Sequence, residues 1–559
     1  MRVLGIEGTA WCASAALYDA EADTVCIESD PYEPDSGGIH PREAAEHMSE
    51  AIPTVIDTVL TAAEDEYGTD AIDAVAFSRG PGLGPCLRTV GTAARSLAGA
   101  LDVPLVGVNH MVAHLEIGRH RSGFENPVCL NASGANAHLL GYHDGRYRVL
   151  GETMDAGVGN AIDKFTRHIG WNHPGGPKVE AAAADADPNA LLDLPYVVKG
   201  MDFSFSGISS AANDAADDDV PVEEICFALQ EHVFAMLTEV SERALSLTGA
   251  DELVLGGGVA QNDRLREMLS TMCAARDADF YAPEPRFLRD NAGMIAVLGA
   301  EMARAGDTVA IPDSAIDPNF RPDQVPVTWR DGDASVARGL RDGSVEPAEG
   351  GVALRGAEAT VEIVSGEAAG DDRRVIKRRV PKTYRHPELD RTLRRDRTVA
   401  EARLTSEARR AGVSTPLVFD VDVPNATLTL QYAGERDLAD DLDAAWTESV
   451  GRQLARLHDA GMVHGDPTTR NVRVGERESD AARTAGATDP TTLIDFGLAY
   501  HTGHVEDHAM DLHVFEGSVE ATATEPGPLI RAFEAGYAAT GEARVLDRLR
   551  EVEGRGRYQ

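Results

Sequence analysis

The sequence predicts an α/β fold, in which a large N-terminal α/β domain is followed by a smaller α+β domain. The chain has 559 residues, more than one hydrophobic core usually organises, so two or more domains are expected. Residues 1–325 alternate short apolar strands with helical segments, which is the pattern of α/β proteins. Residues 326–350 are polar and aperiodic, which predicts a linker, and a second set of strands and helices occupies 351–559.

The elements of the first domain follow from apolar patterning and glycine-rich turns. Residues 2–19 are expected to form a strand, a turn and a second strand. Two strand-to-helix units follow: a strand over 72–78 with a helix over 87–101, and a strand over 103–108 with a helix over 109–118. A hairpin is expected over 127–150 with its turn at Asp144–Gly145, and a strand, glycine loop and helix over 252–269. In the second domain we expect strands over 354–364, 373–380, 416–421 and 427–432, with a long arginine-rich helix before the last two.

Composition excludes several classes of protein. Apolar residues make up 43% of the chain, which indicates packed domains, and no apolar run is long enough to cross a bilayer. The first residues read as a strand and a glycine turn, which is not the pattern of a signal peptide. The six cysteines form no CxxC pair, which argues against a zinc ribbon or a disulfide framework. We therefore expect a cytoplasmic enzyme without a membrane partner.

The chain is strongly acidic, with 92 acidic residues, 52 basic residues and a formal net charge of −40. Only five of the basic residues are lysines, and an acidic surface poor in lysine suits a salt-rich cytoplasm, so we infer a halophile. The segment 373–410 breaks this pattern with 14 basic and five acidic residues. Two interpretations stay open for it: a solvated helix face with intrahelical ion pairs, or a patch that contacts nucleic-acid phosphates.

Two histidines, His110 and His114, suggest a metal site. Their spacing puts both imidazoles on one face of a helix, one turn apart, which suits a transition metal, although unrelated histidines share this spacing by chance. A zinc peptidase of this pattern needs a glutamate beside the first histidine as its general base, and this sequence has Met111 there. The pattern therefore disfavours a peptidase.

Three glycine-rich turns, at 5–9, 131–136 and 256–262, each follow an apolar strand. Such turns bring backbone N–H groups close to phosphates, and the last of them leads into a helix N-terminus. Together they predict a nucleotide-binding cleft. Asn262 either hydrogen-bonds a ribose or base in that cleft or is an ordinary helix cap.

The second domain carries two motifs typical of kinases. Asp466 and Asn471 have the spacing of a kinase catalytic loop, and Asp495 begins a DFG triplet. In that arrangement Asp466 orients the attacking hydroxyl, while Asn471 and Asp495 hold Mg²⁺. Lys377 is expected to contact the α and β phosphates of ATP, and Glu401 to pair with Lys377. The loop expected over the phosphates consists of Gly356, Ala357, Glu358 and Ala359.

Nine motifs of the first domain occur together in the order GIEGTA, SRGPGLGPCLR, VGVNHMVAH, SGAN, GNAIDKFTR, HPGGPKVE, FSFSGI, LVLGGGVAQN and RDNAGMIA. This set resembles the universal tRNA threonylcarbamoyladenosine-forming family, over residues 1 to about 323. That family belongs to the actin, sugar-kinase and heat-shock-chaperone ATPase superfamily, so the resemblance implies a two-lobed fold. It also implies transfer of a threonylcarbamoyl group from threonylcarbamoyl-AMP to N6 of the adenosine beside the anticodon, in tRNAs that read codons beginning with adenine.

The same resemblance implies site residues. It implies that His110, His114 and Asp290 bind a metal, Fe²⁺ or Zn²⁺. The family commonly has a tyrosine ligand where this chain has Asn131, whose amide oxygen is a weaker ligand than a phenolate. The residues implied to hold the adenylate are Asn131, Ala132, Ser133, Gly134, Ala135, Asp163, Gly176, Glu180 and Asn262.

The second domain resembles the small atypical kinase of the KEOPS complex. HGD replaces HRD, no APE segment follows DFG, one glycine stands in the phosphate loop where kinases have three, and Pro467 and Arg470 depart from the family's catalytic loop. The resemblance implies a small bilobal domain that uses ATP and Mg²⁺ as an atypical serine/threonine kinase or ATPase and regulates or powers the modification cycle. The implied partners are tRNA, threonylcarbamoyl-AMP and the small KEOPS subunits. In some archaea the two subunits are fused, which raises the effective concentration across their interface.

Two alternatives to this bifunctional tRNA-modifying enzyme stay open. One is a metallopeptidase with a pseudokinase scaffold, which would use the two histidines of HMVAH. The other keeps the tRNA chemistry but makes the second domain a regulatory ATPase or scaffold module, because it lacks an activation segment.

Overall fold

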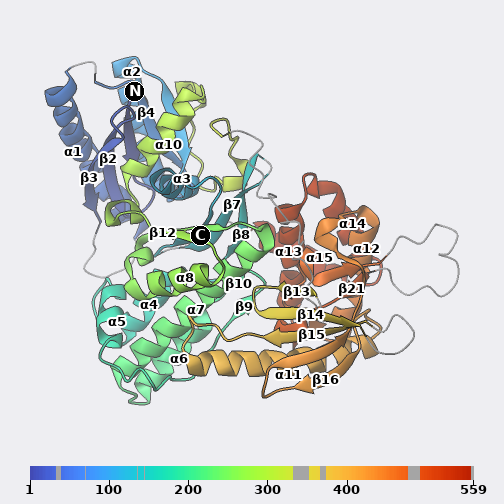
Figure 1. The fold of residues 1–559 in the computed structure, drawn as a ribbon. Coiled ribbons are helices and arrows are strands. Elements are labelled where there is room, and N and C mark those ends of the chain that lie inside the picture. The colour runs from blue at the N-terminus through green and yellow to red at the C-terminus, as the bar shows by residue number, and fades with distance from the viewer. Residues whose placement is uncertain are drawn as a thin grey trace.

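The computed structural model describes residues 1–32, 40–68, 71–134, 136–143, 145–330, 352–365, 373–475 and 491–554. Figure 1 shows two α/β lobes that follow one another in the first part of the chain, and a further α+β body formed by the yellow to red part. The predicted fold class is confirmed. Some predicted features lie outside the described residues, namely Ala135 of the adenylate turn, Asp144 of the hairpin turn and residues 331–350 of the linker.

The first lobe is built on a five-stranded mixed sheet with the order β3-β2-β1-β4-β5. β2 pairs antiparallel with β1 and β3, whereas β1, β4 and β5 are parallel. The helices α1 and α2 cover one face of the sheet around an apolar cluster. The elements are β1 (Arg2–Glu7), β2 (Cys12–Asp19), β3 (Thr24–Pro31), α1 (Pro41–Tyr67), β4 (Ala74–Gly80), α2 (Gly84–Leu101) and β5 (Leu105–Asn109).

The second lobe repeats this topology, because its sheet has the order β12-β11-β6-β7-β8 with one antiparallel meander and parallel strands beside it. The predicted hairpin is confirmed as β7 and β8. The strands are β6 (Val128–Ala132), β7 (Ala137–His143), β8 (Arg146–Glu152), β11 (Glu252–Gly256) and β12 (Asp279–Tyr281), with the short pair β9 (Val198–Lys199) and β10 (Asp202–Phe203) apart from them. The helices of this lobe are α4 (Val158–His168), α5 (Gly176–Ala183), α6 (Ser206–Asp217), α7 (Val222–Thr248), α8 (Asp263–Ala275) and the short α9 (Pro285–Leu288).

Two helices, α3 (His110–Ser122) and α10 (Ala292–Arg304), lie between the two sheets. One apolar cluster joins Leu115 of α3 and Ile295 of α10 to strands of both lobes, including Val254 of β11. Nine consecutive residues of α3, His110–Gly118, are buried. A helix buried on all sides is a core helix. The first turn of α3 is therefore held rigidly in the interior.

The first domain extends beyond the predicted boundary at residue 325. Arg330 packs into it, with its guanidinium 3.9 Å from the ring centroid of Tyr142 and 3.2 Å from Oε1 of Glu116. Residues 326–330 thus belong structurally to the first domain. Polarity alone predicts a linker there, because the partners of Arg330 lie far away in the sequence.

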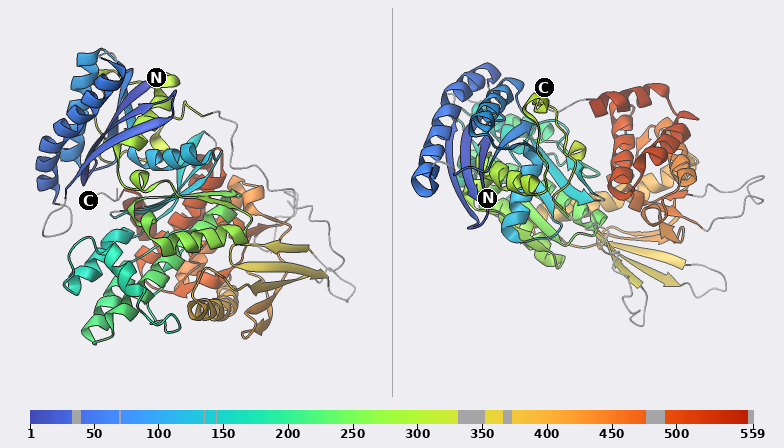
Figure 2. Two further views of the ribbon diagram at one scale, coloured as in Figure 1. Left: turned by 60° about the vertical axis from the view of Figure 1, so that its left-hand side comes forward. Right: turned by 90° about the horizontal axis from the view of Figure 1, so that it is seen from above.

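The second domain has two lobes. Its first lobe is an antiparallel sheet with the order β13-β14-β15-β17-β16, packed against α11, and its second lobe is mainly helical. Figure 2 shows the sheet and the helical lobe from two further sides. The first lobe contains β13 (Val352–Arg355), β14 (Ala359–Ser365), β15 (Arg373–Arg379), α11 (Pro387–Arg410), β16 (Val418–Asp422) and β17 (Thr427–Gln431). The second contains α12 (Ala444–Asp459), α13 (Val505–Thr522), α14 (Pro526–Ala538) and α15 (Ala543–Gly554), with short strands β18 (Arg436–Asp437), β19 (Met462–Val463), β20 (Val472–Val474), β21 (Thr491–Leu493) and β22 (Tyr500–His501).

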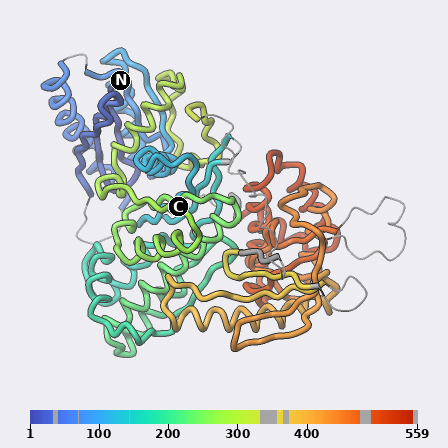
Figure 3. The backbone as a smooth tube through the Cα atoms, viewed as in Figure 1, coloured from blue at the N-terminus to red at the C-terminus, as the bar shows by residue number. Residues whose placement is uncertain are grey.

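The two domains meet along α7. In Figure 3 the chain between β15 and α11 reaches the green helices of the second lobe. In this segment Lys382 Nζ lies 2.5 Å from Oε1 of Glu242, and Arg385 Nη2 lies 2.7 Å from Oε2 of Glu239. Both glutamates belong to α7, so charged side chains join the domains. In the described part of the chain, no helix combines the length and apolarity needed to span a membrane.

Candidate active sites

Two imidazoles and one carboxylate converge in the first domain. His110 and His114 lie one turn apart at the start of α3, and Asp290 reaches them from the loop between α9 and α10. Oδ1 of Asp290 lies 3.4 Å from Nε2 of His110 and 3.3 Å from Nε2 of His114. The three ligand atoms lie within 4.8 Å of one another, and this donor set suits iron or zinc. Both histidines are buried, while the Asp290 side chain keeps 17% of its surface exposed.

Helix α3 starts at His110 because Asn109 caps it. Oδ1 of Asn109 accepts the backbone N–H groups of Met111 (3.0 Å) and Val112 (3.1 Å). Its Nδ2 donates to the carbonyl oxygen of Phe320 at 2.8 Å, which anchors the cap to the C-terminal part of the domain. The cap therefore sets where the first histidine of the pair stands.

Glu7, at the end of β1, orients His110. Its Oε2 lies 3.1 Å from Nδ1 of His110, and its Oε1 accepts the N–H of Thr9 at 2.8 Å. The Ser78 hydroxyl donates to Oε2 as well, and Glu7 is fully buried. A carboxylate on Nδ1–H holds the tautomer whose Nε2 is free for a metal, and here Nε2 faces Asp290. Sequence reasoning missed this role, because Glu7 lies 103 residues from His110. The sequence indicated only that Glu7 belongs to the glycine-rich turn GIEGT.

The charges of the cluster complement one another. Burial opposes a proton on His110, but Glu7 and Asp290 outweigh it and raise the pKa of His110 to about 10. Burial lowers the pKa of His114, so its imidazole stays neutral and keeps a lone pair for a metal. The pKa of Asp290 is held far below its usual range against the effect of burial, chiefly by His110. His114 and Asp290 are therefore already in the form that binds a divalent metal, whereas His110 carries a proton that a bound metal would have to displace.

Replacing Glu7 by glutamine is expected to weaken metal binding roughly 10- to 100-fold, because the amide holds the His110 tautomer less firmly than the carboxylate does. The measurement is competition for Zn²⁺ or Co²⁺ against a chromophoric chelator. Glu50→Gln, at an exposed position of α1, is the matched control and should bind like the wild type. Equal affinities of the two variants would contradict the orienting role of Glu7.

Asn131 lies beside His138 on the neighbouring strand β7. Oδ1 of Asn131 and both ring nitrogens of His138 are buried and have no hydrogen-bond partner among the described residues. Burial, aided by His114 and His110, lowers the pKa of His138 to about 3, so it is neutral. Uncompensated polar atoms are costly in a protein interior, and here they are neighbours of the histidine pair.

The turn after β6 is tied to the start of α4. The carbonyl oxygen of Gly134 accepts the N–H of Asn160 at 2.8 Å, and the Ser133 hydroxyl donates to the carbonyl oxygen of Asn136 at 2.8 Å. A Cβ atom on Gly159 would lie 2.7 Å from Cα of Gly134, so the two segments approach closely. The remaining predicted residues of this turn are Ala132, which ends β6, and Ala135, which lies outside the described residues.

Asp163 lies on α4, and Gly176 lies at the start of α5. Oδ1 of Asp163 accepts the N–H of Gly175 at 2.7 Å, and its Oδ2 lies 3.0 Å from Nδ1 of His173. The carboxylate therefore shapes the loop that precedes α5. Gly176 opens that helix, and a Cβ atom added to it would meet nothing within 4 Å, so this side of the turn faces open space.

Glu180 joins α5 to α8, and Asn262 joins α8 to α7. Oε1 of Glu180 accepts the N–H of Asp263 at 2.9 Å. Oδ1 of Asn262 caps α8 by accepting the N–H of Arg264 at 2.9 Å, and its Nδ2 donates to Gln230 at 3.2 Å. The contacts of Asn262 are thus those of a helix cap, which was the second of its two interpretations.

In the second domain, Lys377 and Glu401, which were predicted to bind ATP, come together with Asp495, which was predicted to bind Mg²⁺. Nζ of Lys377 lies 2.9 Å from Oε1 of Glu401 and 2.7 Å from Oδ1 of Asp495. Arg379, which sequence reasoning missed, adds a 2.6 Å contact to Glu401. Burial alone would raise the pKa of Asp495, but Lys377 and then Arg379 lower it to about 2. This carboxylate is therefore ionised at neutral pH, as a Mg²⁺ ligand must be.

Hydrogen bonds within the predicted catalytic loop hold its conformation. Nδ2 of Asn471 donates to the backbone oxygen of Asp466 at 2.8 Å and to its Oδ2 at 3.1 Å. Asp511 of α13 holds the preceding turn, because its carboxylate accepts the N–H groups of His464 and Gly465, each at 2.8 Å. Burial raises the pKa of Asp466. A buried carboxylate held in this way is placed to orient a nucleophile.

Part of the basic segment 373–410 is buried inside the protein. Five of its basic side chains are buried or nearly so and form ion pairs with glutamates of α7, of α11 or of the loop before β14. These are Lys377, Arg379, Lys382, Arg385 and Arg397. They cannot contact tRNA phosphates, and neither sequence interpretation of the segment, intrahelical pairs or nucleic acid, describes them.

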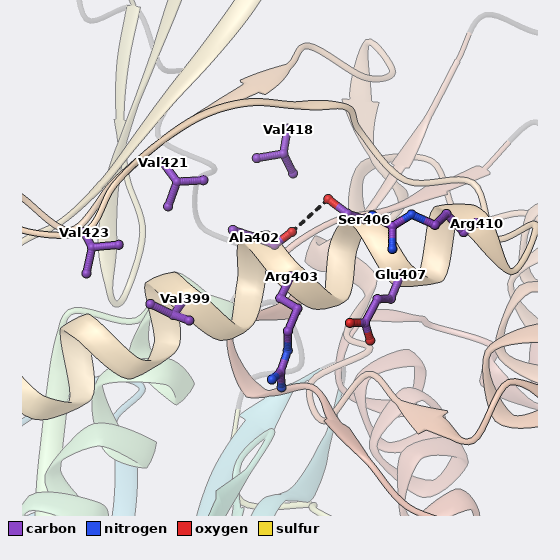
Figure 4. A pocket seen from close by; sticks show the side chains of 9 residues that line it. All are labelled: Val399, Ala402, Arg403, Ser406, Glu407, Arg410, Val418, Val421 and Val423. Atoms are coloured by element: carbon purple, nitrogen blue, oxygen red, sulfur yellow. Dashed lines mark hydrogen bonds between the residues drawn. The ribbon is translucent and has the colours of Figure 1, made fainter.

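A hollow of about 430 Å³ lies between α11 and β16. Figure 4 shows its lining, in which Val418, Val421 and Val423 face the helix. The side chains of α11 that line it differ from those that meet Lys377 and Arg379. None of the predicted site residues takes part in it.

Comparisons with known proteins cover the whole chain. The family of tRNA N6-adenosine threonylcarbamoyltransferases matches residues 23–297. Proteins described as "probable bifunctional tRNA threonylcarbamoyladenosine biosynthesis protein" match over 100% of this chain and at least 99% of their own length. The identity is 67% over 560 residues for Haloquadratum walsbyi, 67% over 562 for Halobacterium salinarum and 48% over 558 for Methanospirillum hungatei.

Solved structures resemble parts of the chain at low identity. T. kodakarensis HypF has a TM-score of 0.41 at 11% identity, over 56% of this chain and 49% of its own. The Rio2 kinase of Chaetomium thermophilum has a TM-score of 0.24 at 17% identity, over 36% of this chain and 69% of its own. The first of these likenesses spans about half of each chain and the second about a third of this one.

Proposed function

The chain belongs to the family of bifunctional tRNA threonylcarbamoyladenosine biosynthesis proteins, and from this premise we propose how its two halves divide the work. It is an enzyme of tRNA modification, and its first half contains a tRNA N6-adenosine threonylcarbamoyltransferase domain. We call residues 1–330 the transferase half and residues 352–554 the kinase half. The donor in our proposal is threonylcarbamoyl-AMP, the acceptor is N6 of the adenosine beside the anticodon, and AMP is released.

The residues proposed to hold the metal are His110, His114 and Asp290. When bound, Fe²⁺ or Zn²⁺ supplies Lewis-acid polarisation of a donor oxygen. The protein contributes rigidity, because α3 is buried on all sides and Glu7 holds the orientation of His110. The observation that carries this proposal is the convergence of these three side chains from segments that lie 176 residues apart.

Transfer in this site relies on positioning. The nitrogen of the acceptor amine bonds to the carbamoyl carbon, the bond from that carbon to the AMP phosphate oxygen breaks with its electron pair leaving on AMP, and the amine loses one proton to solvent. A covalent cysteine intermediate is disfavoured, because burial raises the pKa of the Cys12 thiol to about 12, with Asp290 and Glu7 acting in the same direction. The turn after β6 and the open side of Gly176 are proposed to align the adenylate.

The test is a complete modification assay. The full chain, the small KEOPS subunits proposed as partners and an adenylate-forming enzyme are incubated with unmodified tRNA, ATP, threonine and bicarbonate. We expect threonylcarbamoyladenosine in the digested tRNA, measured by mass spectrometry. Its absence from a metal-loaded sample would refute the proposed reaction, and leaving out the small subunits tests their part in it.

For the kinase half we propose ATP hydrolysis that serves the modification cycle, with Mg²⁺ held by Asn471 and Asp495. One contact favours hydrolysis over protein phosphorylation: Arg243 of the transferase half lies 2.8 Å from Asp466, where the hydroxyl of a protein substrate would have to enter. The metallopeptidase alternative has no support. Met111 is buried in the apolar core where that mechanism needs a general base, and the relatives are described as tRNA biosynthesis proteins.

A further inference from the structure

An arginine of the transferase half enters the catalytic centre of the kinase half. Arg243 lies on α7, and its Nη1 donates to Oδ2 of Asp466 at 2.8 Å. Its Nη2 donates to Oε1 of Glu358 at 2.7 Å. Only 10% of the Arg243 side chain is exposed. The guanidinium thus bridges the catalytic loop and the loop expected over the phosphates of ATP.

Arg243 is held in this position from its own helix. Its Nε lies 3.2 Å from Oε1 of Glu239, one turn earlier on α7. Glu239 is 1% exposed and also meets Arg397 of α11 at 3.0 Å. Support through Nε fixes the plane of the guanidinium, so that its two terminal nitrogens point at Asp466 and Glu358. The side chain is therefore oriented before any nucleotide arrives.

Several arginine side chains surround the carboxylate of Glu358. Besides Arg243 it meets Arg397, and these two cations, with Arg385 and Arg379 further away, hold its pKa well below the usual range despite burial. Glu358 belongs to the loop predicted to cover the phosphates, as does Gly356, whose N–H donates to Ala359 in a tight turn at 2.9 Å. The cations thus surround an anion in the phosphate-binding region.

We propose that Arg243 is an arginine finger, a catalytic residue that the transferase half supplies to ATP hydrolysis in the kinase half. This rests on the proposed function of the kinase half as an ATPase. The triphosphate of ATP carries more negative charge than a carboxylate and repels Glu358. Its phosphate oxygens therefore replace Glu358 as the hydrogen-bond partner of Arg243 Nη2. The guanidinium then neutralises the charge that the γ-phosphoryl oxygens carry in the transition state.

The chemical step balances without another reactant. The oxygen of a water molecule oriented by Asp466 bonds to the γ-phosphorus, and the bond from that phosphorus to the β,γ-bridging oxygen breaks with its electron pair leaving on ADP. The proton of the water passes to the Asp466 carboxylate and from there to the inorganic phosphate. Since Asp466 and the finger come from different halves, hydrolysis requires the halves to be in contact.

The experiment uses the full chain in high salt, as the wild type, Arg243→Ala and Arg243→Lys. Arg276→Ala is the matched control, because Arg276 is another largely buried arginine that pairs with a glutamate of α7, its Nη1 lying 3.4 Å from Oε1 of Glu242, and its ion pair involves neither Asp466 nor Glu358. Phosphate release gives kcat and KM for MgATP. Calorimetry gives the affinity for MgADP with and without aluminium fluoride, which mimics the transferring phosphoryl group.

For Arg243→Ala we expect kcat to fall by about 100-fold or more, in line with other arginine fingers, while the affinity for MgADP changes little. The tighter binding of MgADP in aluminium fluoride should be lost. Arg243→Lys should show the same pattern, because one ammonium cannot replace the fork. Arg276→Ala should match the wild type in every measurement.

Other outcomes overturn the proposal. Equal or faster hydrolysis by Arg243→Ala makes Arg243 a block of the site and not a finger. Loss of MgADP affinity in both Arg243 variants makes its role structural. A wild type that binds MgATP without hydrolysing it also overturns the finger, whereas a wild type that binds no nucleotide overturns the proposed function beneath it.

Discussion

Replacing Asp290 by alanine is expected to lower the metal affinity of the transferase half by more than about 100-fold and to reduce tRNA modification to a trace. A partner that only orients a metal ligand is worth 10- to 100-fold, and Asp290 is itself a proposed ligand. Its Oδ1 is shared by both histidines, at 3.3 and 3.4 Å, so no other carboxylate in the triad can replace it. Metal content after gel filtration and threonylcarbamoyladenosine yield give the two readouts.

Two controls separate loss of the metal from loss of the fold. Asp57→Ala, at an exposed position of α1, should keep both metal and activity. In Asp290→Ala itself, ATP hydrolysis by the kinase half should persist, which shows that the chain has folded. Full metal occupancy in Asp290→Ala would show that the ion is held elsewhere and would remove the basis of the proposed transferase site.

Replacing Glu239 by alanine is expected to destabilise the contact between the two halves by about 3–5 kcal/mol, because it leaves buried guanidinium groups without their counter-charge. Oε2 of Glu239 accepts from Arg385 at 2.7 Å and from Tyr196 at 2.7 Å, and Arg397 adds a 3.0 Å contact to Oε1. Arg385 and Arg397 belong to the kinase half. Buried pairs are screened less than surface pairs, so the loss should persist in high salt.

Denaturant unfolding of the full chain measures this effect, followed by fluorescence and by circular dichroism. Glu223→Ala is the matched control, since it removes an exposed glutamate from the first turn of the same helix and should cost less than about 1 kcal/mol. Glu239→Gln keeps a hydrogen-bond acceptor without the charge and should fall between the two. A free energy of unfolding for Glu239→Ala within 1 kcal/mol of the wild type would contradict the role of Glu239 in joining the halves.

Much of the architecture could be predicted from local patterns. Apolar alternation and glycine turns predicted the strands of the first lobe and the hairpin of the second, because these signals depend on a few adjacent residues. The spacing of His110 and His114 placed both rings on one helical face for the same reason. The two kinase motifs predicted the neighbourhood of Asp466, Asn471 and Asp495, since their spacing reflects one loop and one turn.

Long-range electrostatic partners could not be predicted in this way. Arg243 lies 223 residues from Asp466, and nothing in the sequence of α7 distinguishes it from an ordinary helical arginine. The excess positive charge of 373–410 was visible, but whether it meets tRNA, solvent or glutamates depends on which surface packs against it. Arg330 shows the same limit, because its partners Glu116 and Tyr142 come from a helix and a strand earlier in the chain.

By itself the sequence determined the α/β and α+β classes, the pairing of the two histidines, the kinase-type loops and the family whose motifs the transferase half carries. These properties reside in short stretches of chain, where hydrophobic period, turn chemistry and residue spacing act directly on the backbone. Only the tertiary structure decided that Glu7 orients His110, that Arg243 contacts Asp466, and that buried arginines of the kinase half form ion pairs with a glutamate of α7. The reason is physical: a charge acquires its partner when packing removes both from water, and packing is decided by the whole fold.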